Sequence, residues 1–92
     1  MSNIHIRRSF TMPRAELRKQ LEDLTASLQE KWPLECQWQT DDCLSFKHSA
    51  VKGEIEIGKD EFELKAELGL LFGAFKGAIE NEIAKFINEH VY

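Results

Sequence analysis

The sequence lacks a long apolar run, and this absence excludes a membrane-spanning helix. Its longest apolar stretch, residues 68–74 with Phe75 directly after them, is far shorter than the roughly 20 residues that a bilayer requires. Residues 1–8 also contain no apolar segment behind a basic one, which a secretory signal would show. We therefore expect a cytoplasmic protein.

Cysteine is scarce, since the chain contains only Cys36 and Cys43. They lie seven positions apart, which matches no paired zinc-ligand spacing. The alternation of the surrounding residues points them to opposite faces of their predicted strands, so no disulfide is expected. The histidines, His5, His48 and His90, fall on different predicted elements, and no metal site is predicted.

Patterns that carry catalysis are also missing. Cys43 and His48 are separated by an odd number of positions on one predicted strand, so their side chains face opposite sides and cannot act as a nucleophile and base. The five glycines are scattered singly, and no phosphate-binding loop is formed. We expect no catalytic residue, no cofactor and no enzyme activity.

Basic residues are fewer than acidic ones: 12 Lys+Arg against 16 Asp+Glu give a formal net charge of -4. A non-specific nucleic-acid binder needs a basic stripe, so nucleic acid is not an expected partner. The acidity is concentrated in residues 53–67, with six acidic residues against two lysines. The solvent side of this hairpin is a predicted acidic face: Glu54, Glu56, Glu61, Glu63 and Glu67. It is either a solvated face with cross-strand ion pairs or a docking surface for a basic partner.

Periodicity predicts a strand, a helix, four strands and a final helix. Residues 4–7 alternate as a half-buried strand does. Leucines at spacings of four, three and four predict a helix over residues 13–31, with Thr11 or Met12 as its cap. Period two over residues 34–68, with turns near 40–42 and 58–60, predicts four strands. A helix over residues 70–89 is expected to bury Leu71, Phe72, Phe75, Ala78, Ile79, Ile83 and Phe86.

These elements predict one α+β domain spanning residues 1–92. Both helices must bury apolar stripes, and only one sheet face is apolar, so both are expected on that face. Placing the first strand beside the last makes every pair in the five-stranded sheet antiparallel, with the order 1-5-4-3-2. This order resembles the TATA-binding-protein-like fold. So small a domain has a thin stability margin, which makes a homodimer a reasonable expectation.

The final helix carries a second set of residues, most of them small, that we call the small-residue flank. Its members are Leu70, Gly73, Ala74, Gly77, Asn81 and Ala84. Glycine inside a helix costs roughly 1 kcal/mol relative to alanine, so the close approach of another surface would explain it. That surface is the first helix, a second copy of the chain, or an apolar partner. The first alternative requires the flank to be covered within one chain.

Glu82 is the carboxylate that projects onto the apolar stripe of the final helix. A buried carboxylate needs a partner, and Arg7 or Arg8 would provide one. The alternative is that Glu82 lies at the edge of the stripe and reaches solvent.

Residues along nearly the whole chain resemble one bacterial family. They are Ile4-His5-Ile6-Arg7-Arg8-Ser9, Leu44, Phe46-Lys47, Val51, Gly53, Ile55, Ile57, Leu68-Gly69, Lys76-Gly77, Ile79-Glu80 and Glu82-Ile83. In these positions the chain resembles the polyhydroxyalkanoic acid system proteins, short proteins encoded near polyester-granule genes. The resemblance implies an association with polyhydroxyalkanoate storage and carries over no catalytic residues. The segment Thr11-Met12-Pro13 departs from the family pattern at the start of the first helix.

Two functional hypotheses follow. In the first, the chain is a non-enzymatic cytoplasmic protein associated with polyhydroxyalkanoate granules, and its final helix binds a granule protein or the polymer surface. In the second, it is a small helix-grip-like carrier that holds an acyl chain or another apolar ligand between the sheet and the final helix. Its predicted lining is Trp38, Phe46, Ile57, Phe62, Phe75 and Ile79. The carrier requires a cavity on the order of 300 Å³ or more.

Overall fold

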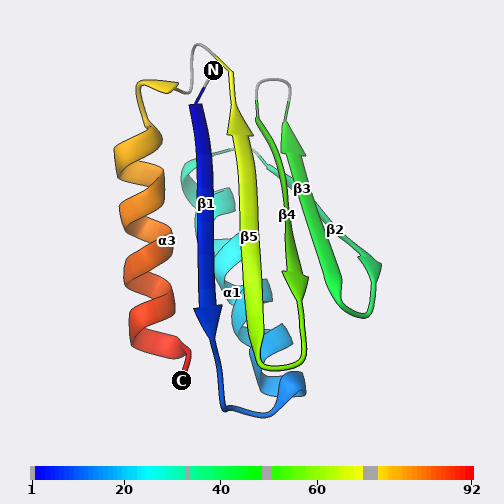
Figure 1. Ribbon diagram of the computed structural model, residues 1–92. Helices are drawn as coiled ribbons and strands as arrows, with labels where there is room; N and C mark the ends of the chain where they lie inside the picture. Colours follow the sequence, from blue (N-terminus) through cyan, green and yellow to red (C-terminus); the bar gives the residue numbers. More distant parts are fainter. Residues whose placement is uncertain (1, 33, 49–50, 70–72) are drawn as a thin grey trace.

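A computed structural model of the chain describes residues 2–32, 34–48, 51–69 and 73–92. The strands are β1 (Ser2–Ser9), β2 (Glu35–Thr40), β3 (Cys43–His48), β4 (Val51–Ile57) and β5 (Glu61–Leu68), and the helices are α1 (Arg14–Lys31) and α3 (Lys76–His90). The strands form one sheet in the order β1-β5-β4-β3-β2, and every neighbouring pair is antiparallel (Figure 1). The predicted α+β class and strand order are confirmed.

The two helices cover the same face of the sheet. In Figure 1, α1 lies behind the strands and α3 runs alongside β1. The predicted leucine stripe of α1 is buried, and it joins one apolar cluster with the inward residues of the sheet and of α3. Ile4, Ile55 and Leu64 belong to this cluster and are almost fully buried. Because alternate strand residues point to opposite faces, the remaining polar positions form an open sheet face.

The start of α1 differs from the prediction. Pro13 is the N-cap residue, with no side-chain cap bond, so the predicted cap at Thr11 or Met12 is wrong. The backbone N–H groups of Thr11 and Met12 instead both donate to the carbonyl oxygen of Tyr92, each at 2.8 Å. The C-terminal residue therefore orients the chain before α1. Trp32 ends the helix in an extended conformation, in agreement with the predicted boundary.

The buried stripe of α3 also differs from the prediction. It consists of Ile79, Ile83 and Ile87, whereas Ala78 is exposed and Phe86 is half-buried. Phe75 precedes the first helical turn and is 50% exposed. The expected core contribution of residues 70–72 lies outside the described residues. The stripe is rotated because α3 packs beside β1 and α1, so the position of these neighbours decides which side is buried.

Neither α1 nor α3 is a membrane-spanning segment. In the described part of the chain, no helix combines the length and the apolar character needed to cross a bilayer.

Candidate functional site

The small-residue flank does not lie on one continuous helix over residues 70–89 as predicted, because α3 begins only at Lys76 and Gly73 and Ala74 precede it. Ala74, Gly77 and Asn81 are exposed, and Gly73 and Ala84 are half-buried. A Cβ atom added to Gly77 would meet nothing within 4 Å. Leu70 lies outside the described residues. Packing against α1 therefore does not cover these three members.

Two further residues extend this exposed surface. Ala78 lies on the outward side of α3, and Phe75 is one of the large apolar side chains that remain exposed. We call the combined surface the α3 patch; its members are Ala74, Phe75, Gly77, Ala78 and Asn81. None of them is charged. Lys85 follows one turn later on the same side and limits the patch.

The five glutamates of the predicted acidic face all lie on the open side of β4 and β5, as their alternation predicts. Those on β5 have cationic partners. Glu63 accepts hydrogen bonds from His5 Nε2 at 2.7 Å and Arg7 at 3.0 Å. Glu61 pairs with Arg7 at 3.5 Å, and Glu67 pairs with Lys52 at 3.6 Å. The β5 side of the face therefore agrees with the interpretation as a solvated surface with cross-strand ion pairs.

Glu63 has the most perturbed carboxyl group of this surface. Its pKa is lowered to about 2, chiefly by the hydrogen bond from His5; desolvation, the next largest effect, raises the pKa, and Lys65 and Arg7 lower it. Glu63 is thus held as a carboxylate by three neighbouring side chains. An ionised group so well compensated leaves little free charge to attract a basic partner.

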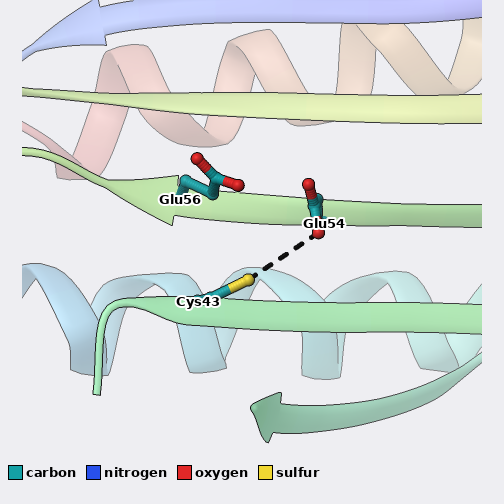
Figure 2. A group of neighbouring side chains, drawn as sticks. All are labelled: Cys43, Glu54 and Glu56. Atoms are coloured by element: carbon teal, nitrogen blue, oxygen red, sulfur yellow. Dashed lines mark hydrogen bonds between the residues drawn. The ribbon is translucent and has the colours of Figure 1, made fainter. Parts of the chain in front are cut away.

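The two glutamates of β4 have a different environment. Glu54 and Glu56 have no cationic side chain within ion-pair distance in the described ranges. They lie beside Cys43 of β3, whose Sγ is 3.8 Å from Glu54 Oε2 (Figure 2). One ligand atom from each of the three residues lies within 4.8 Å of the others. Burial, followed by the two nearby carboxylates, raises the pKa of the Cys43 thiol.

The sequence did not predict that these three residues are in contact. Alternation placed Cys43, Glu54 and Glu56 on the same face, but their contact depends on the register in which Cys43 lies opposite Glu56. Cys36 points to the helix side, and both thiols are free, in agreement with the prediction. Among the described residues, Cys43, Glu54 and Glu56 are the one group of three or more side chains close enough together to share a metal ion, and the group contains no histidine.

Glu82 has a partner from the other helix. Its carboxylate accepts a hydrogen bond from Lys31 Nζ at the end of α1, so the proposed pairing with Arg7 or Arg8 is wrong. The side chain of Glu82 remains 39% exposed, as expected for a position at the edge of the stripe. This ion pair connects α1 and α3 rather than forming part of a buried site.

The interior offers little room for a ligand. A cavity between the helices and the sheet, bordered by Phe46 and Ile79, has a volume of about 20 Å³, whereas small-molecule pockets span roughly 300–1,000 Å³. Trp38, a predicted lining residue, instead donates to Glu22. A larger hollow of about 510 Å³ lies on the open sheet face, where His5, Lys52 and Glu54 are among the residues that line it. The described residues therefore give the acyl-carrier hypothesis no support.

Comparison with known proteins gives one family match. The model of the family described as "Putative polyhydroxyalkanoic acid system protein" matches residues 4–91 of the chain. No curated protein and no solved structure matches significantly.

Proposed function

The chain belongs to the polyhydroxyalkanoic acid system protein family, and on this premise we propose that it is a non-enzymatic protein that binds the surface of polyhydroxyalkanoate granules through the α3 patch. The cytoplasm, where such granules would be reached, is its proposed location. The proposal depends chiefly on one observation: the α3 patch is exposed and uncharged in a chain of which 30% of the residues are charged.

The chemistry of a polyester surface fits this patch. Ester oxygens accept hydrogen bonds but donate none, and the rest of the polymer is apolar. Ala74, Gly77 and Ala78 present small apolar groups that lose little side-chain entropy on contact. The amide group of Asn81 supplies hydrogen-bond donors, and Phe75 supplies an apolar surface that is already half exposed. A charged patch would have to be desolvated against a polymer that offers no counter-charge.

Co-sedimentation with protein-free polyhydroxybutyrate particles tests the proposal. Ala78→Glu places a charge in the patch, and Ala26→Glu, at an exposed position of α1, is the matched control. We expect the wild type and Ala26→Glu to sediment with the particles and Ala78→Glu to remain in the supernatant. Circular dichroism should show that both variants remain folded, because neither position is buried.

Three results would contradict the proposal. One is that the wild type does not bind the particles. Another is that Ala78→Glu and Ala26→Glu bind equally well. The third is that binding requires native granules with their protein coat, which would identify a granule protein, rather than the polymer, as the partner.

A further inference from the structure

We propose that the free edge of β2 pairs with the same edge of a second copy of the chain, so that the two sheets join into one continuous sheet. β2 is the outermost strand of the sheet on the side away from α3 (Figure 1). The α3 patch lies at the opposite end of the sheet, beside β1. The pairing therefore leaves that patch open and does not depend on granule binding.

The direction of the β2 backbone groups identifies those that this edge leaves unpaired. Ser45 Oγ of β3 donates to the carbonyl oxygen of Gln37 at 3.2 Å, so the backbone groups of Gln37 point towards β3. In an antiparallel pair, the N–H and C=O of one residue point to the same side and successive residues alternate. Those of Cys36 and Trp38 therefore point away from β3. In the described part of the chain, no hydrogen bond reaches them.

The positions on either side do not extend this unpaired segment. The backbone N–H of Leu34 donates to Trp32, and its carbonyl oxygen accepts a hydrogen bond from Gln29. On the other side, the register with β3 becomes irregular after Trp38. The regular free edge consequently offers the backbone groups of Cys36 and Trp38.

A two-fold axis beside Gln37 gives both of these residues a partner. Cys36 of one copy then lies opposite Trp38 of the other, and each such pair exchanges both of its backbone hydrogen bonds. Gln37 lies opposite its own copy, and Glu35 lies opposite Gln39. No like charges face each other in this register, so the edge is complementary to itself.

The two neighbouring registers are less favourable. An axis beside Trp38 places Glu35 opposite Asp41 of the second copy, and like charges at opposite positions destabilise a sheet. An axis beside Cys36 places Trp38 opposite Leu34, whose backbone groups already have partners.

β2 also lacks the residues with which edge strands commonly prevent such pairing. Its only charged residue is Glu35, and it contains neither lysine nor proline. The opposite edge strand, β1, carries Arg7 and Arg8 and has α3 beside it. Cys36 and Trp38 are half-buried and pack against the core. Pairing would cover more of both side chains and continue the apolar layer from one copy to the next.

Disulfide trapping tests the register, in a chain that carries Cys36→Ser and Cys43→Ser. At a non-hydrogen-bonded pair the Cα atoms are about 4.5 Å apart, a distance that a disulfide accepts. Gln37→Cys should therefore form a covalent dimer on oxidation with diamide. Gln39→Cys, at another exposed position of β2, is the matched control. Its two copies would lie roughly 14 Å apart, so it should stay monomeric.

Sedimentation velocity over a concentration series gives a second measurement in the natural background. Gln37→Lys and Gln37→Glu should each be monomeric at concentrations where the wild type dimerises, because like charges would meet at the axis. An equal mixture of the two variants should restore the dimer, since opposite charges then meet. Gln39→Lys, which would lie opposite Glu35, should dimerise at least as well as the wild type.

Three results would overturn the proposal. They are a wild type that is monomeric at every concentration, equal trapping of Gln37→Cys and Gln39→Cys, and a mixture of the two charged variants that stays monomeric. A dimer that Ala78→Glu disrupts and Gln37→Lys does not would place the interface on the α3 patch instead. If the background with Cys36→Ser fails to fold, the charged variants decide the question.

Discussion

Two glycines of this protein should respond to the same substitution with opposite changes in stability. Gly53 lies in β4, where an added Cβ would be 2.6 Å from Cζ of Phe46 and would overlap the carbonyl oxygen of Lys65. Gly77 lies in the first turn of α3, where an added Cβ would meet nothing within 4 Å. Neither glycine has a positive φ, so the difference between the sites is one of space rather than backbone strain.

The expected magnitudes follow from this difference. Gly77→Ala gains helix propensity without a new clash, which is worth about 0.5–1 kcal/mol. Gly53→Ala must displace a buried ring and a backbone carbonyl, and overpacking of this kind costs about 1–3 kcal/mol. The carbonyl belongs to β5, which pairs with β4 in the centre of the sheet. It cannot move without straining the strand pair, so the cost for Gly53→Ala should fall in the upper half of that range.

Thermal and urea unfolding of the wild type and the two variants measures the effect. For a domain of this size, 1 kcal/mol shifts Tm by roughly 4–8 °C. Gly77→Ala should raise Tm by about 2–8 °C, and Gly53→Ala should lower it by roughly 8 °C or more. The reasoning is refuted if Gly53→Ala is as stable as the wild type, or if Gly77→Ala is destabilised.

Two other predictions concern polar contacts. The lowered pKa of Glu63 means that its ionised form stabilises the fold; this contribution is complete above pH 4.5, the ordinary value, and is lost as the pH falls towards 2. Between these limits Tm should therefore fall more steeply in the wild type than in Glu63→Gln, and parallel curves from pH 7 to 2 would contradict this. Arg14 donates to Asp42 Oδ1 at 2.7 Å and to the carbonyl oxygen of Gly58 at 2.7 Å. Because the group is partly exposed, Arg14→Ala should lower the unfolding free energy in urea by about 1–2 kcal/mol, whereas the control Arg8→Ala should have little effect.

The functional surfaces were only partly predictable from the residues. The spacing identifies the small-residue flank, but it predicts Phe75 and Ala78 in the core. In the structure Phe75 is exposed just before α3, and Ala78 lies on the exposed side of α3. The acidic face was located correctly, since alternation determines the side of a strand. Which glutamates would be neutralised could not be predicted, because the cations that reach β5 come from three different strands.

The sequence by itself determined the order of the elements, the extent of α1 and the antiparallel arrangement of the sheet. These follow from local periodicity and from short connections, which leave few ways to bury one apolar face. Tertiary structure decided three further features: which side of α3 is buried, the pairing of Glu82 with Lys31, and the meeting of Cys43 with Glu54 and Glu56. Each depends on the rotation of a helix or the register between strands. A shift of one residue in strand register, or a rotation of a helix by about 100°, would change all of these contacts. The hydrophobic pattern of the sequence would be the same in either case.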